Sequence, residues 1–195
     1  MGVRAKKRGC MTRLVVVLAV ALLFGAAGAY FLRNAYDRYA YPLEYQELVA
    51  FYARERELPP SLVYAVICCE SGFDPEAQSN VGAKGLMQLV DETFEWAQMR
   101  DGIRDYEDPA RLYDPEMNIR YGTLVLRLLL DEFGSTENAV AAYHAGWGNV
   151  KGWLADNAYS PDGRTLSLIP FGDTRAYVKK VLHTQKKYQE LYGVE

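Results

Sequence analysis

An uncharged run of 19 residues near the amino terminus, residues 14–32, limits what this chain can fold into more than any other feature. About twenty consecutive apolar residues are enough to cross a bilayer as a helix. The charged side chains before the run are all basic, which predicts that residues 1–13 stay in the cytoplasm as a tail and that the rest is exported. We therefore expect a transmembrane anchor at residues 14–32, a linker at residues 33–41 and one folded domain at residues 42–195.

A cleaved signal peptide is the alternative interpretation of the same run. Ala27, Gly28 and Ala29 have the small-x-small pattern of a cleavage site. The apolar run continues past that site, and this favours the uncleaved anchor. The anchor predicts a single-pass membrane protein whose folded domain lies outside the cytoplasm.

Charge separates the two parts of the chain. All five charged residues among the first 32 are basic, and the other 17 lysines and arginines face 25 acidic residues, a net charge of −8. An acidic domain is a poor partner for nucleic acid, because duplex affinity depends on neutralising phosphates. The chain has only two histidines, and no histidine or cysteine cluster has metal-ligand spacing, so we expect neither a metal nor a cofactor.

Helical periodicity predicts an all-α domain after the linker. The clearest helix begins at Asp114 and Pro115, a cap followed by a favoured first helical residue, and runs to Phe133 before Gly134. The other expected helices share apolar residues at helical spacing, and we place them at residues 42–57, 62–70, 86–98, 138–144, 150–155 and 173–191. We expect Ser61, Ser135 or Thr136, and Asp173 to cap three of them.

A carboxylate ends the most apolar of these helices. Val63, Val66, Ile67 and Glu70 share one helical face, so Glu70 points where the apolar side chains point. A carboxylate in that position is poorly solvated, and its pKa should rise towards neutrality. A general acid needs this property, although a glutamate at a helix end is more often a solvated residue without such a role.

Four ordered segments between residues 60 and 182 resemble the motifs of the soluble lytic transglycosylase family, within the goose-lysozyme-like superfamily. They are Glu70 to Phe73 (ESGF), Ser79 to Gln88 (SNVGAKGLMQ), Ala142 to Gly146 (AYHAG) and Ile169 to Val178 (IPFGDTRAYV). The resemblance implies a lysozyme-like helical domain that cleaves the bond between N-acetylmuramic acid and N-acetylglucosamine in peptidoglycan. The product would carry a 1,6-anhydro ring, with one glutamate acting first as acid and then as base.

The resemblance also implies roles for single residues. Glu70 matches the catalytic acid, Ser79 the serine near the acetamido group, and Gln88 a glutamine that lines the groove. Tyr143 matches the tyrosine that orients the catalytic carboxylate. Ser71 belongs to the first motif, where a local capping role is at least as good an interpretation. His144 replaces the usual asparagine and Asp173 the usual glutamate, so both are departures within the substrate-binding motifs.

Two other functions remain open from the sequence. A muramidase of the same fold would hydrolyse the same bond with water, and a non-catalytic scaffold would bind cell wall through the same groove. A two-carboxylate hydrolase needs a second acid roughly 5 to 9.5 Å from the first. Asp74, Glu76, Asp91 and Asp173 are poor candidates, which favours a one-carboxylate mechanism. The expected partners are glycan strands of peptidoglycan, the cytoplasmic membrane, and a cell-wall or secretion apparatus.

Overall fold

The computed structural model describes residues 2–104 and 107–195, and side chains from residue 16 onward within those ranges. Contacts divide the chain into two units, residues 1–40 and 41–195. No strand occurs in the described residues, where isolated bridges join Lys84 to Gln78 and to Leu89. The predicted all-α class is confirmed.

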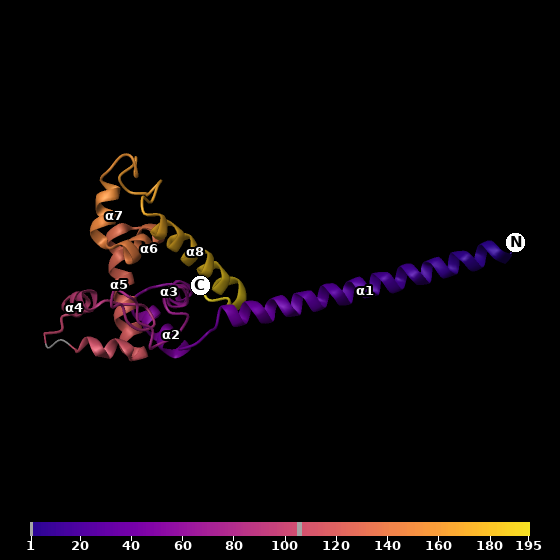
Figure 1. Ribbon diagram of the computed structural model, residues 1–195, viewed down its shortest axis with the longest axis horizontal. Coiled ribbons are helices and arrows are strands. Elements are labelled where there is room, and N and C mark those ends of the chain that lie inside the picture. Colours follow the sequence, from indigo (N-terminus) through magenta and orange to yellow (C-terminus); the bar gives the residue numbers. More distant parts are fainter. Residues whose placement is uncertain (1, 105–106) are drawn as a thin grey trace. The chain divides into compact units, whose positions relative to one another are not determined.

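The first unit is one uninterrupted helix, α1 (Gly2–Ala40), drawn as a single rod in Figure 1. Its segment Val16–Ala40 is long and apolar enough to cross a membrane. The described apolar side chains of this segment are exposed, among them Leu22, Leu23 and Phe24. Residues 33–40, which we predicted as a linker, continue the helix, so the change in structure comes at Tyr41.

The described residues of the second unit form eight helical elements, α2 to α8 with one 3-10 helix. In chain order they are α2 (Gln46–Glu55), α3 (Pro60–Glu70), α4 (Asp91–Arg100), η1 (Pro109–Tyr113), α5 (Pro115–Phe133), α6 (Thr136–Ala145), α7 (Trp147–Leu154) and α8 (Gly172–Tyr192). Helix α3 packs against α8, and α6 packs against both α5 and α8 (Figure 1). These contacts gather the ends of α3 and α6 and the start of α8, although they lie far apart in the sequence.

Helix α5 behaves as its sequence predicts. The Asp114 carboxylate accepts hydrogen bonds from the backbone N–H groups of Glu116 and Met117, and Gly134 ends the helix with φ of 67°. Most of its side chains between Met117 and Leu129 are buried. Ser135 caps α6 by accepting from the Asn138 N–H, as predicted.

Two of the predicted caps are wrong. Helix α3 begins at Pro60, because the first turn of a helix tolerates a residue that has no backbone N–H. Ser61 is a buried residue inside this helix. Helix α8 begins at Gly172 after Phe171, so Asp173 lies inside the first turn. Its carboxylate accepts from the adjacent Thr174 N–H at 2.8 Å.

The predicted helix start at Leu86 is also wrong, because α4 begins five residues later at Asp91. Gly85 and Gln88 have positive φ values of 71° and 49°, which a right-handed helix does not contain. Leu86, Met87 and Leu89 are nevertheless buried. The spacing of these apolar residues therefore comes from their burial in a tight loop, although it resembles the periodicity of a helix.

The loop between α3 and α4 is held from inside by Asn118 of α5. Its amide donates to the carbonyls of Lys84 (2.9 Å) and Leu112 (2.7 Å), and its Oδ1 accepts from the Met87 N–H at 2.7 Å. A Cβ atom on Gly85 would lie 2.1 Å from the Leu112 carbonyl oxygen, so only glycine fits against this amide.

Candidate functional site

Glu70 is the last residue of α3 and is half-buried. Burial raises the pKa of its carboxyl to about 7, and this outweighs the opposing effects of a hydrogen bond from Tyr177 and the charge of Lys180. The carboxyl therefore exchanges its proton near neutral pH. This is the environment that the helical face containing Val63, Val66 and Ile67 predicted.

Tyr177 of α8 is the residue that contacts this carboxyl. Its hydroxyl donates to Glu70 Oε1 at 2.5 Å. Burial and the adjacent carboxyl raise the pKa of Tyr177 well above its usual value, so it remains a donor. The same end of α3 is tied to α8 by Lys180, whose Nζ donates to the Cys69 carbonyl at 3.1 Å.

The sequence analysis did not single out Tyr177, although it lies within the fourth motif. It is 107 residues from Glu70, and no local pattern joins the two. A signal that the sequence did contain is the spacing within the fourth motif: Tyr177 lies three residues after Thr174, so both residues are on the same face of α8.

Tyr143, expected to orient the carboxylate, makes a different hydrogen bond. Its hydroxyl donates to the Met87 carbonyl at 2.7 Å. Burial, and then the charge of Glu70, raise the pKa of Tyr143 well above its usual value, which shows that its ring still lies in the field of that carboxyl. The hydrogen bond to the Glu70 carboxyl thus comes from Tyr177, and the predicted role of Tyr143 in orienting the carboxylate stays a prediction.

The motif residues of the loop mainly bind backbone. Ser71 donates to the Leu86 carbonyl at 2.9 Å and accepts from the Phe73 N–H, so it joins the end of α3 to the loop. Ser79 Oγ accepts from the Ala83 N–H at 3.0 Å, and Gln88 Nε2 donates to the carbonyls of Ala77 and Gly85. All three side chains are partly exposed.

The two departures from the family motifs lie on either side of the α6–α8 contact. His144, at the end of α6, is exposed and places Nδ1 3.1 Å from Thr174 Oγ1. Its ring lies against that of Tyr177, with 4.5 Å between centroids. Asp173 is exposed, and its carboxylate accepts a hydrogen bond from the backbone of its own helix.

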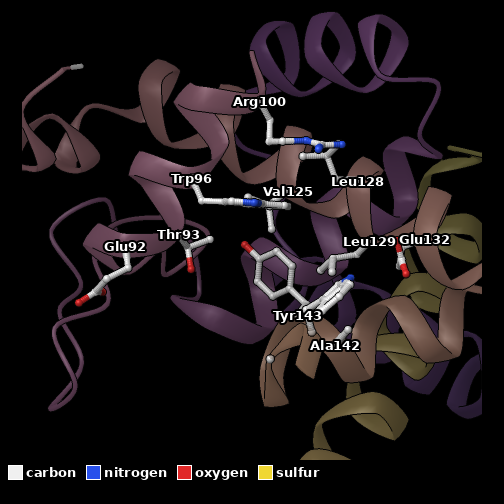
Figure 2. Close-up of a pocket in the computed structure, with 12 residues that line it drawn as sticks. Glu92, Thr93, Trp96, Arg100, Val125, Leu128, Leu129, Glu132, Ala142 and Tyr143 are labelled. Carbon is white, nitrogen blue, oxygen red and sulfur yellow. The ribbon is translucent and has the colours of Figure 1, made fainter. Parts of the chain in front are cut away.

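A cavity of about 490 Å³ opens beside Tyr143, between α4, α5 and the junction of α6 and α7. Figure 2 shows Tyr143 among Thr93, Trp96 and Leu129. The walls are mostly apolar, with charged groups from Glu92, Arg100 and Glu132 at the lining. Trp147 also lines the cavity and is 45% exposed, whereas Trp153 is buried against Phe171. Of Trp147 and Trp153, only Trp147 lines the cavity.

The other carboxylates considered as a second acid have local partners. Asp91 binds Lys84 at 2.6 Å, and Asp74 accepts from the Glu76 N–H within a turn, while Glu76 is exposed. Among the described residues no carboxylate contributes to the pKa shift of Glu70. The described part of the chain also contains no group of three or more metal-binding side chains.

Comparison with known families supports the motif assignment. The family described as "Transglycosylase SLT domain" matches residues 47–165. The soluble lytic murein transglycosylase of Escherichia coli K12 is 37% identical over 155 residues, which cover 78% of this chain and 24% of that protein. The membrane-bound lytic murein transglycosylase C of Actinobacillus pleuropneumoniae (strain L20) is 36% identical over 166 residues, covering 74% of this chain and 46% of the relative. This chain therefore spans less than half the length of these relatives.

Solved structures agree with the fold. The crystal structure of the 70 kDa soluble lytic transglycosylase of Escherichia coli superposes with a TM-score of 0.71 at 37% identity, covering 79% of this chain and 25% of that one. The Slt lytic transglycosylase of Pseudomonas aeruginosa, solved as an inactive Glu-to-Gln mutant, gives a TM-score of 0.69 at 32% identity over 80% of this chain and 25% of its own.

Proposed function

Because this chain belongs to the transglycosylase SLT family, we propose that its second unit is a lytic transglycosylase that cleaves the glycan strands of peptidoglycan without water. The observation that carries the proposal is the half-buried Glu70 carboxyl, with a pKa of about 7 and a hydrogen bond from Tyr177. A group with this pKa donates and accepts a proton at neutral pH, as a single acid and base must.

In the proposed reaction, protonated Glu70 first donates its proton to the oxygen between N-acetylmuramic acid and N-acetylglucosamine. The bond from C1 of the muramic sugar to this oxygen breaks, and the leaving sugar departs as an alcohol. The Tyr177 hydroxyl then stabilises the newly formed Glu70 carboxylate, because a donated hydrogen bond favours the charged form.

The second half of the reaction returns the proton to Glu70. The muramic C6 hydroxyl attacks C1 and gives its proton to the Glu70 carboxylate, which closes the 1,6-anhydro ring. The substrate's acetamido carbonyl stabilises the cationic centre in place of a second carboxylate. The local hydrogen bonds of Asp74 and Asp173, and the ion pair of Asp91 with Lys84, support this one-carboxylate scheme.

We assign the cavity beside Tyr143 to the glycan strand. Apolar and aromatic side chains suit the faces of sugar rings, and Trp147 and Trp96 supply two of them. Ser79 and Gln88 are proposed to bind substrate because they match motif positions of the family. In the structure their side chains make hydrogen bonds to the backbone of the loop between α3 and α4.

We further propose that α1 anchors the enzyme in the cytoplasmic membrane, with residues 1–13 inside and the catalytic unit outside. The length and apolar character of Val16–Ala40 support this, as does the membrane-bound relative. Its exposed aromatic residues Tyr30, Phe31, Tyr36 and Tyr39 suit the interface between membrane and water.

Product analysis tests the activity. The full-length protein is incubated with purified peptidoglycan, and the soluble muropeptides are analysed by mass. Products lighter than hydrolytic ones by one water, without new reducing ends, are expected. Free reducing ends would instead indicate a muramidase, and an absence of any soluble product would indicate a scaffold.

The amino terminus of protein isolated from membranes tests the anchor. Sequencing is expected to find the chain beginning near Met1. A mature terminus at Tyr30 would mean that the apolar run is a cleaved signal peptide.

A further inference from the structure

The contact between α6 and α8 joins His144 to the residue that binds Glu70. His144 Nδ1 lies 3.1 Å from Thr174 Oγ1, and its ring lies 4.5 Å from that of Tyr177 with an interplanar angle of 32°. Thr174 is fully buried, and it precedes Tyr177 by three residues on α8. Two contacts on one helical face therefore fix the imidazole against the Tyr177 ring.

The position of the Tyr177 ring decides whether its hydroxyl reaches Glu70. The hydrogen bond to Glu70 Oε1 is 2.5 Å long, and a rotation about the side-chain torsions of Tyr177 would break it. His144 covers one face of this ring, and because it is itself exposed, the solvent would otherwise reach that face.

We propose that His144 is a positioning residue that holds the Tyr177 hydroxyl on the catalytic carboxyl of Glu70. The inference rests on the proposed function of Glu70. It deepens that function by assigning a role to a residue at which the chain departs from its family motif. His144 touches neither the substrate nor the reacting atoms in this scheme.

The charged and titratable groups around Glu70 show why the effect should pass through Tyr177. From α8, Tyr177 and Lys180 both lower the Glu70 pKa, against the larger rise caused by burial. Tyr143 faces the carboxyl from α6, and Cys69 adjoins it on α3. Lys180 donates a hydrogen bond to the Cys69 carbonyl and Tyr143 donates one to the Met87 carbonyl, so neither side chain depends on His144 for its position. His144 should therefore act on Glu70 through the hydrogen bond from Tyr177.

Loss of the His144 ring should weaken the bond from Tyr177 and thereby raise the Glu70 pKa. The acid must be protonated to act, so the fall in kcat/KM on the alkaline side should move to higher pH. We expect His144→Ala to lower kcat about tenfold with little change in KM, less than the roughly 10²-fold that a 1 Å misplacement can cause.

The test measures pH profiles and kinetics of the full-length His144→Ala, Tyr177→Phe and double variants. Tyr177→Phe should shift the alkaline limb in the same direction. If His144 acts through Tyr177, adding His144→Ala to Tyr177→Phe should change kcat by less than about twofold. His183→Ala is the matched control, because His183 is an exposed histidine further along α8.

Independent effects of the two substitutions, or an unchanged pH profile in His144→Ala, would overturn the inference. If His144→Ala does not fold, His144→Phe and His144→Asn make the same contrast, because the first keeps a ring on Tyr177 and the second removes it. Phe is then expected to retain the wild-type profile and Asn to lose it. The reverse order, or equal profiles, would contradict the proposal.

Glu70→Gln separates this inference from the function on which it rests. An active Glu70→Gln variant would refute the proposed catalytic role itself. An inactive one, combined with independent effects of His144 and Tyr177, would refute only the positioning role.

Discussion

The fully buried Asn118 binds the loop between α3 and α4, the half-buried Glu70 directly precedes that loop, and the surroundings of the two side chains differ. Asn118 on α5 is fully buried and makes three hydrogen bonds, all to backbone groups of the loop or of η1. The Glu70 carboxyl on α3 accepts a hydrogen bond from one side chain among the described residues, the hydroxyl of Tyr177, and its pKa is raised to about 7.

The difference separates a structural polar group from a chemical one. A buried amide whose donors and acceptor are paired stabilises the fold, because its partners would otherwise be buried without hydrogen bonds. A carboxyl with acceptor capacity left over is destabilised in its charged form, and it can therefore exchange a proton with a ligand. The following substitutions test this division, beginning with the largest expected effect.

Glu70→Gln should abolish activity while the fold is retained. Gln has the same shape and still accepts from Tyr177, but it cannot donate a proton as an acid. The expected loss of rate is on the order of 10² to 10⁴ or more, because no second carboxylate substitutes for it. A zymogram on purified cell wall, with the release of muropeptides followed in time, measures it.

Circular dichroism should show an unchanged helical signal for the Glu70→Gln variant. A rate above about a tenth of wild type would show that Glu70 is not the acid. Glu55→Gln is the matched control, since it makes the same change at an exposed glutamate at the end of α2, and it should remain active.

Asn118→Leu should destabilise the fold, in contrast to Glu70→Gln. Leucine has a similar volume but leaves the Met87 N–H and the carbonyls of Lys84 and Leu112 without their partner. We expect a loss of about 3 kcal/mol in the free energy of unfolding, measured by denaturant titration.

The exposed Asn149 offers the control for this substitution, and Asn149→Ala should change stability by less than about 0.5 kcal/mol. If Asn118→Leu unfolds at the wild-type denaturant concentration, the loop does not depend on the buried amide.

The pH dependence of stability should distinguish the two residues again. The Glu70 pKa is raised from 4.5 to about 7 in the folded state, so between these values the folded chain holds the extra proton. Stability from this group is therefore lost as pH rises through 7, by up to about 3 kcal/mol.

Glu70→Gln should accordingly be more stable than wild type at pH 8 and equally stable at pH 4, which denaturant titrations at both pH values can measure. A stability difference that does not vary with pH would mean that Glu70 is not desolvated. Asn118→Leu removes no titratable group and should lose a similar amount of stability at both values.

The smallest expected effect concerns the cavity wall. Trp147→Ala removes an exposed ring from the cavity without touching Glu70 or Asn118. A sugar-stacking role predicts a rise in KM of about three- to tenfold with kcat unchanged. Steady-state kinetics measure the change, and Phe51→Ala on α2 is a control exposed to a similar degree. An unchanged KM would remove Trp147 from the binding site.

The side of α3 to which Glu70 points could be predicted from sequence, because its cause is local. The apolar residues Val63, Val66 and Ile67 lie within two turns of it on the same helix, and helical geometry alone places them on its side. Tyr177 could not be assigned in the same way, because its contact with Glu70 depends on how α8 packs against α3. The resemblance implied that Tyr143 orients the Glu70 carboxylate, but in the structure the Tyr143 hydroxyl donates a hydrogen bond to the Met87 carbonyl.

The loop before α4 shows how local patterns can mislead. Leu86 and Leu89 have helical spacing, yet the positive φ values of Gly85 and Gln88 exclude a helix there. A hydrogen bond to Asn118, some thirty residues later in the chain, holds this segment in place, so local propensity does not predict it. Asp173 does not cap α8, because the helix begins one residue before it, at Gly172.

The sequence by itself determined the apolar segment of α1, the all-α class, both ends of α5 and the carboxyl that ends α3. Each depends on hydrophobic period, capping or turn chemistry among residues a few positions apart. Only the tertiary structure decided that Tyr177 meets Glu70, that His144 covers Tyr177 and that Asn118 holds the loop. These contacts join residues on different helices, and the desolvation that sets the pKa of Glu70 depends on the atoms that packing brings around it.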